Sequence, residues 1–173
     1  MLVNFLIFRA PNDCFQYLTG VSGSISSLNY PTTMLTDILY TICVRQEDGY
    51  CGIEWKQADT TTDSFELDDA TTQNALVGGA NASAGDAYIS IPGAMHDLYS
   101  GNSLADEIPV AEDTSTNPDT PATQETTGGT IQAWGMPFTL SVNTYNVDDD
   151  DVPGFNLVYN QLPCGNHRST TTS

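Results

Sequence analysis

The sequence predicts an all-β protein, either a sandwich or a barrel of short strands. Thr, Ser, Asn, Asp and Gly are abundant, and this composition favours strands and turns over helices. Apolar and polar residues alternate in several short segments, as they do in strands that bury one face. Turn-forming residues separate the segments. Seven or more short strands with such spacing are typical of sandwiches and barrels.

The expected strands begin near the first cysteine. They cover residues 15–18, 38–45, 51–56, 64–68, 87–91, 138–143 and 155–160. Residues 23–31 are polar with a few apolar side chains, and we expect them to form a turn-rich connection.

Two pairs of these strands are expected to form antiparallel hairpins. Residues 38–45 and 51–56 are separated by a short run of turn formers that includes a glycine, which is a hairpin signal. Residues 138–143 and 155–160 flank an acidic turn at 148–151, and we expect them to form a second hairpin.

The first thirteen residues form a segment of their own before the predicted sandwich. Its apolar side chains are Leu2, Val3, Phe5, Leu6, Ile7 and Phe8, interrupted only by Asn4. A strand of this kind is apolar on both faces, as in strands buried on both sides. The run is too short to span a bilayer, and it lacks the basic start of a signal peptide. We therefore expect residues 1–13 to be mature structure, as an interdomain strand or a donor strand.

Two destinations remain open for this N-terminal strand. It can fold back on its own sandwich as an ordinary edge or core strand. It can instead enter a neighbouring copy, because a sandwich with an open edge accepts an added strand. Such a contact is heterologous, and it would add copies head to tail into a fibre.

Two further segments are polar and poor in apolar residues. Residues 100–130 are rich in Thr, Pro, Asp and Glu and are expected to be a long loop. Residues 165–173 form a Ser- and Thr-rich tail that suits a linker or O-glycosylation. Asn81 begins the glycosylation sequon Asn-Ala-Ser, which agrees with secretion.

The charge of the chain limits its partners. Lys and Arg number 4, against 22 Asp and Glu, for a formal net charge of −18. Such a surface repels the phosphates of nucleic acids and the anionic lipids of membranes, so we expect no partner of either kind. It suits calcium, a basic extracellular protein, or mutual repulsion between soluble copies.

The cysteines point to an oxidising compartment. Cys14, Cys43, Cys51 and Cys164 are widely spaced and form no CxxC pair. The histidines, at positions 96 and 167, do not stand at a zinc-ligand spacing. Four such cysteines predict two disulfides in a secreted protein. The other interpretation is four free, buried thiols in a cytosolic protein.

Several motifs occur in an order that resembles the CUB domain. An opening cysteine at position 14 leads through a Gly-rich stretch to Asn29-Tyr30-Pro31 and then to Cys43. The later motifs look like a variant found in secreted arthropod proteins. They are Tyr40–Glu47, Gly49-Tyr50-Cys51, Tyr88–Gly93, Gly154–Leu157 and Gln161–Cys164. The resemblance covers residues 9–164.

This resemblance implies a jelly-roll β-sandwich of two antiparallel sheets over residues 14–164. It also implies that Cys14 pairs with Cys43, and Cys51–Cys164 then follows by exclusion. In similar proteins a second CUB domain often precedes this one, and residues 1–8 would then connect the two domains. The usual later disulfide of CUB domains is missing here, since no cysteine lies near residues 85–88.

Some CUB domains bind calcium beside that place, which makes calcium the one cofactor expected. Asp86 occupies roughly the matching position. Asp37 and one residue of the 148–151 run, such as Asp149, could complete a site of hard oxygen ligands. The alternative is that the aspartate run is a solvated turn.

No catalytic residue is predicted. The chain contains no GxSxG elbow, P-loop or GxGxxG motif. His96 stands next to Asp97, but sequence neighbours do not make a catalytic triad. Paired carboxylates are uninformative in so acidic a chain.

We therefore expect a non-enzymatic, extracellular, CUB-like interaction module. It would assemble with other copies of itself into a fibre through the N-terminal strand. The alternative is a monomeric, calcium-dependent module that binds a basic extracellular protein or a glycan.

Overall fold

The structure is a computed structural model of the 173-residue chain. It describes residues 13–59, 64–67, 75–77, 87–96, 98–101, 104, 129–145 and 152–165. The regular elements of these segments are all strands, as the composition predicts. In the described ranges there is no helix long and apolar enough to cross a membrane.

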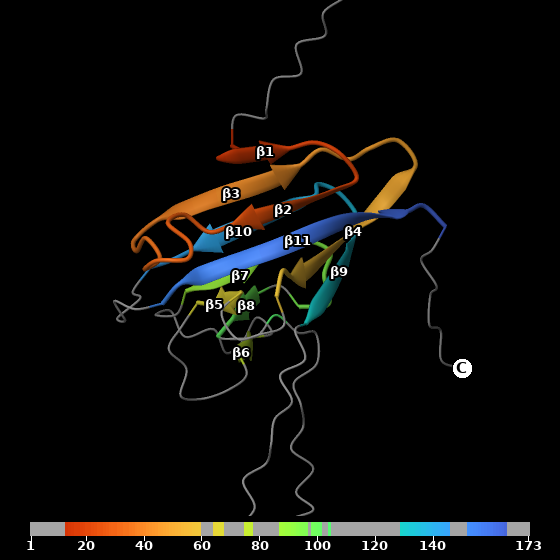
Figure 1. Cartoon of the computed structure of the whole chain (residues 1–173). Helices are drawn as coiled ribbons and strands as arrows, with labels where there is room; N and C mark the ends of the chain where they lie inside the picture. The colour runs from red at the N-terminus through yellow and green to blue at the C-terminus, as the bar shows by residue number, and fades with distance from the viewer. Residues whose placement is uncertain are drawn as a thin grey trace, which may run out of the picture.

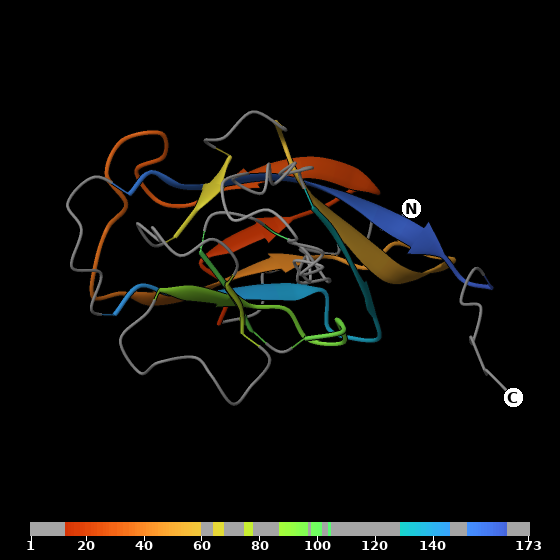
Figure 2. The ribbon, with the colours of Figure 1, turned by 90° about the horizontal axis from the view of Figure 1, so that it is seen from below.

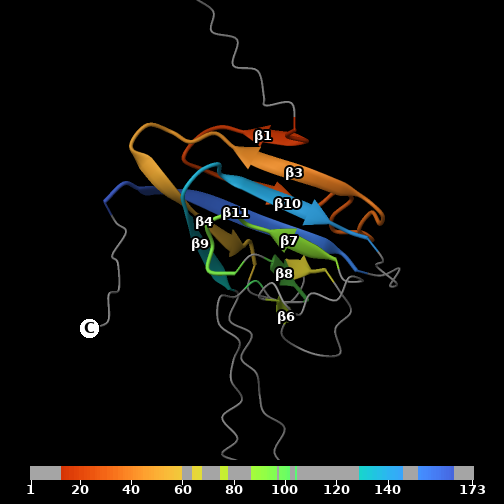
Figure 3. The same ribbon diagram turned by 180° about the vertical axis from the view of Figure 1, so that it is seen from behind.

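The strands form two sheets that pack face to face as a β-sandwich (Figures 1 and 2). The first sheet contains, in spatial order, β1 (Gln16–Leu18), β3 (Leu39–Val44), β10 (Thr139–Asn143), β7 (Tyr88–Ser90), β8 (Leu98–Ser100) and β6 (Ala75–Val77). Figure 3 shows this sheet from its outer side. The second contains β2 (Ser22–Ser26), β11 (Gly154–Pro163), β4 (Tyr50–Gln57) and β9 (Thr130–Trp134), and β5 (Phe65–Glu66) pairs with β11.

The expected sandwich of two sheets is confirmed, with one parallel contact in it. Between the strands that the structure describes, every pairing is antiparallel except that of β1 and β3, which run in the same direction. This pairing is possible because β1 is followed by a change of sheet: residues 19–21 carry the chain to β2 in the second sheet. β1 and β2 therefore form edges of the two sheets on the same side of the sandwich (Figure 1).

Both predicted hairpins are wrong. β3 pairs with β1 and β10, whereas β4 pairs with β11 and β9 in the other sheet. β10 and β11 are likewise in different sheets. Each connection crosses between the layers, a distance of about 10 Å that a few residues can span. Alternation along a strand shows which face is buried, but it does not show which strand lies alongside.

Four strands were not expected. β2 falls in the stretch assigned to a turn-rich connection, and β6, β8 and β9 lie outside the predicted strands. β2 has the sequence Ser-Gly-Ser-Ile-Ser and buries only one apolar side chain, Ile25. A Cβ on Gly23 would lie 2.7 Å from the Tyr159 ring, so this glycine leaves room for a core aromatic side chain.

The hydrophobic core lies between the sheets, and the predicted alternation is confirmed. On β3 Tyr40, Ile42 and Val44 are buried and Leu39 is 66% exposed; Cys43, in the opposite phase, is buried as well and forms a disulfide with Cys14. β4, β10 and β11 follow the same rule with the buried residues Ile53, Trp55, Leu140, Val142, Phe155, Leu157 and Tyr159. Trp55 and Tyr159 stand opposite each other on neighbouring strands, with ring centroids 5.9 Å apart.

Two disulfides connect the strands across the fold. Cys14 is joined to Cys43 on β3, with their Cα atoms 5.7 Å apart. Cys51 on β4 is joined to Cys164, which follows β11, at a Cα separation of 4.8 Å. These are the pairs that the resemblance implies. They close loops of very different length, with sequence separations of 29 and 113 residues.

The longer loop should make the second disulfide the more stabilising one. Loop-closure entropy predicts about 4.7 kcal/mol for a loop of roughly 100 residues and about 3.5 kcal/mol for one of roughly 30. We therefore expect a Cys51→Ala/Cys164→Ala double variant to lose about 1 kcal/mol more stability than Cys14→Ala/Cys43→Ala. Urea unfolding of the two variants checks this. Equal losses would contradict an entropic origin.

Candidate interaction edge

The side of the sandwich that carries β1 and β2 has the features of an interaction edge. Both are edge strands of their sheets, and the chain enters β1 directly from the N-terminal segment. Neither strand contains a charged residue or a proline. We call β2 and the partly exposed apolar residues Leu18, Val21 and Leu28 the interaction edge.

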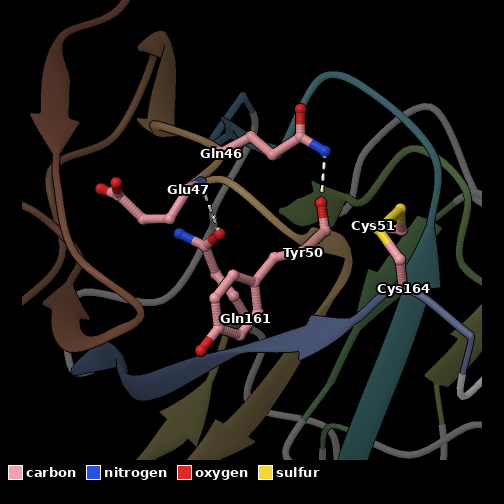
Figure 4. The surroundings of a disulfide bond; sticks show 6 residues. All are labelled: Gln46, Glu47, Tyr50, Cys51, Gln161 and Cys164. Carbon is pink, nitrogen blue, oxygen red and sulfur yellow. Dashed lines mark hydrogen bonds between the residues drawn. A yellow bond between two sulfur atoms is a disulfide. The ribbon is translucent and has the colours of Figure 1, made fainter.

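A buried glutamine fixes the turn between these two strands. Gln161 on β11 is only 5% exposed. Its Nε2 donates to the carbonyl oxygens of Gly20 and Arg45 at 2.9 and 2.8 Å. Its Oε1 accepts from the N–H of Glu47 at 2.9 Å (Figure 4). One side chain therefore holds the β1–β2 turn and the β3–β4 turn against β11.

Further hydrogen bonds around this glutamine hold the same turns. The backbone N–H of Gln161 donates to the Val21 carbonyl at 2.7 Å. The Tyr159 hydroxyl donates to the Thr19 carbonyl at 3.4 Å. The Gln46 amide donates to the Tyr50 carbonyl, beside the Cys51–Cys164 bridge (Figure 4). The first two of these bonds hold the residues that lead into β2, and the third holds the β3–β4 turn.

Glu47 connects the two turns through its carboxylate. Its Oε1 accepts from the N–H of Gly20 at 2.8 Å and from Nη2 of Arg45 at 2.7 Å. The hydrogen bond from Arg45 is the main reason that the pKa of Glu47 is lowered, and the Gly20 N–H adds to it. Burial raises the pKa of the nearby Tyr159 hydroxyl, and the charge of Glu47 raises it further.

Charged side chains are almost excluded from the strands. Across the eleven strands they are Glu54, Lys56 and Glu66, on β4 and β5. The edges β1, β2, β6 and β9 have none. Natural proteins usually protect exposed edges with charges, proline or bulges. β2 has none of these protections, and within the described segments β11 is the one strand that pairs with it.

The opposite edge of the second sheet is partly covered. The N–H of Trp134 on β9 donates to the Gly93 carbonyl at 3.0 Å, so the turn at Gly93 lies against the end of this strand. Gly93 has φ of +80° and approaches the Trp134 carbonyl so closely that a Cβ would not fit. The Trp134 ring lies over Gly52, whose Cβ would be 2.7 Å from it.

Most other residues singled out from the sequence lie outside the described segments. They are Asn81, Asp86, Asp149 and the N-terminal residues Leu2, Val3, Phe5, Leu6, Ile7 and Phe8. Asp37 is exposed in the β2–β3 connection, where its N–H donates to the Thr144 carbonyl at 2.9 Å. Calcium binding stays a prediction. Among the described residues, no three His, Cys, Asp or Glu side chains gather at one place that could hold a metal.

Sequence reasoning did not find Gln161 or Glu47, although the sequence contains a signal for the first. Phe155, Leu157 and Tyr159 are core-facing, and Gln161 is the next residue in the same phase. A polar residue at a core-facing position needs hydrogen-bond partners, so it marks a buried network. Glu47 carries no such signal, because it lies in a turn where acidic residues are common.

The comparisons with known proteins agree with the geometry. The model of the animal CUB domain family matches residues 11–162. This region covers every described strand apart from the last residue of β11. A search of curated proteins finds no match.

Replacing the buried glutamine should destabilise the fold. Gln161→Ala leaves the N–H of Glu47 and the carbonyls of Gly20 and Arg45 without their partner, at a cost on the order of 2 kcal/mol. Gln132→Ala is the matched control, because Gln132 is exposed and makes one side-chain bond, to Glu54. We expect it to stay within about 0.5 kcal/mol of the parent. Urea unfolding measures both, and equal losses would rule out the glutamine network.

The carboxylate of Glu47 should contribute stability that depends on pH. Its pKa is lower in the folded chain, so its contribution is present above the unfolded value of about 4.3 and is lost as the pH falls through the native pKa. Glu47→Gln should therefore flatten the loss of stability on acidification below about pH 5. Arg45→Leu removes the main cause of the lowered Glu47 pKa, and it should flatten the loss of stability on acidification in a similar way. Urea midpoints across this range test the prediction, which fails if both variants keep the parent slope.

Proposed function

Since this chain belongs to the animal CUB domain family, we propose that it is a secreted module that assembles with other copies of itself. CUB domains are typically extracellular, generally mediate protein–protein interactions and generally lack catalytic activity. The two disulfides fit such a compartment. In the proposed assembly, the apolar N-terminal strand of one copy adds to an open sheet edge of the next.

The observation that carries this proposal is the lack of edge protection on β2. Its five residues include no charge and no proline, in a chain with 26 charged side chains (22 acidic and 4 basic). Strand addition obtains its affinity from main-chain hydrogen bonds, for which an uncharged open edge is the required partner. An N-terminal segment apolar on both faces has the matching property, since it needs a partner that removes it from water.

The charge of the chain suits assembly through a neutral edge. Copies with a net charge of −18 repel one another. Screening shortens this repulsion to about 8 Å at physiological ionic strength. We therefore expect assembly to be stronger at 150 mM salt than at 10 mM. Donor and acceptor are different parts of the chain, so the contact is heterologous and forms an open chain of copies.

The first test is the mass of the non-reduced protein by light scattering, with and without residues 1–8. We expect the complete chain to form large or open-ended assemblies and the shortened chain to be a monomer of about 18 kDa, since one complete chain has a mass of 18.6 kDa. The Cys14–Cys43 bridge and the core should remain, because they lie beyond the removed residues. A monomer in both forms would contradict self-assembly and would leave a monomeric, calcium-dependent binding module, which calcium titration then tests.

A further inference from the structure

We propose that β2 is the edge that accepts the strand, and that its occupant is the segment Leu2–Phe8 of a neighbouring copy. This inference rests on the proposed function and names the acceptor within it. Both edges of the second sheet, β2 and β9, are uncharged, so charge does not distinguish them. Backbone hydrogen bonding does.

The hydrogen bonds between β2 and β11 show which backbone groups of β2 point outward. The Ser27 N–H donates to the Phe155 carbonyl at 2.9 Å, and the Gln161 N–H donates to the Val21 carbonyl at 2.7 Å. Inward-bonded and outward-facing positions alternate along an antiparallel strand. Gly23 and Ile25, in register with Tyr159 and Leu157, therefore bond to β11.

The three serines of β2 have the opposite orientation. The N–H and C=O groups of Ser22, Ser24 and Ser26 point away from β11, and they bond to no other described residue. These serines are every second residue of β2, which is the spacing at which an added strand would form its hydrogen bonds. Their small hydroxyl side chains present no bulky or charged obstacle to it.

The same alternation on β9 leaves less room for an added strand. Gly135 donates its N–H to the Cys51 carbonyl at 3.3 Å, so the outward groups of β9 belong to Thr130, Gln132 and Trp134. The last of these already donates to Gly93. The close approach of Gly93 to the Trp134 carbonyl means that Gly93 lies where an incoming strand would pair with this end of β9.

The surroundings of β2 also suit an apolar strand. Val21 precedes it and is 43% exposed, and Leu28 lies two residues beyond its end and is only partly buried. Leu18 on β1 is likewise half-buried against the core on this side. An added apolar strand would cover these side chains, which adds hydrophobic burial to the main-chain bonds. The described chain begins at Asp13, three residues before β1, and β1 is the neighbouring edge strand on the side of the interaction edge.

Proline substitutions in the complete chain test this assignment. Ser24→Pro removes an outward N–H from β2 and breaks no internal hydrogen bond, since proline is tolerated at such edge positions. Gln132→Pro is the matched control on β9, where the N–H also points outward. A third variant, Phe5→Asp/Ile7→Asp, disables the donor. Near-UV circular dichroism and thermal unfolding report on folding, and light scattering reports the mass.

If β2 is the acceptor, Ser24→Pro and the donor variant fall to the mass of one chain, while Gln132→Pro assembles like the parent. If Ser24→Pro also fails to fold, Ser22→Pro at the first position of the strand replaces it. Assembly by Ser24→Pro, with a monomeric donor variant, overturns the choice of edge and leaves the proposed function intact. Assembly by the donor variant, with a monomeric Ser24→Pro, shows that β2 pairs with another occupant, such as β2 of a second copy. Assembly by both variants overturns the inference and the proposed function together.

Discussion

The alternation of side chains along β11 is the constraint on which most of this sandwich depends. Every second residue from Phe155 to Gln161 faces the space between the sheets. The backbone of the same strand pairs with β2, β4 and β5, and the strand leads to the cysteine that bonds to β4. A shift of one residue would turn its core side chains to solvent and move Gln161 away from the turns. The central strand thus sets both the core and the position of the interaction edge.

Much of the core could be predicted from the sequence, but the pairing of the strands could not. Alternation identifies the buried face of β3, β4, β10 and β11, because it reports burial residue by residue. It contains no information about the neighbouring strand, and both predicted hairpins fail for this reason. β2 escaped prediction because serine and glycine are typical of turns, and its place in the sheet is set by the partner strand β11. The disulfide pairs came from the family resemblance and agree with the structure.

The hydrogen-bond network shows a similar division between local and non-local information. The polar residue Gln161 stands out in the sequence, since it continues the phase of three core residues. Its partners do not, because they are backbone groups of turns more than a hundred residues away. Glu47 acquires its low pKa from Arg45 two residues away, but only the fold brings the Gly20 N–H to the same carboxylate.

In the proposed assembly, the acidic charge and the strand edges control association in different ways. Among the acidic residues that the structure describes, Glu54 and Glu66 stand on strands and the others lie in the connections. Repulsion between connections acts on any approach of two copies, whatever their orientation. Attraction at β2 requires a strand that lies about 4.8 Å away and in register. Because β2 contains no acidic residue, this pairing places no carboxylate of β2 against the added strand. In the proposed assembly, such a chain would resist random aggregation while the neutral edge β2 remains able to bind a strand. The acidic charge would then select the mode of association instead of preventing it.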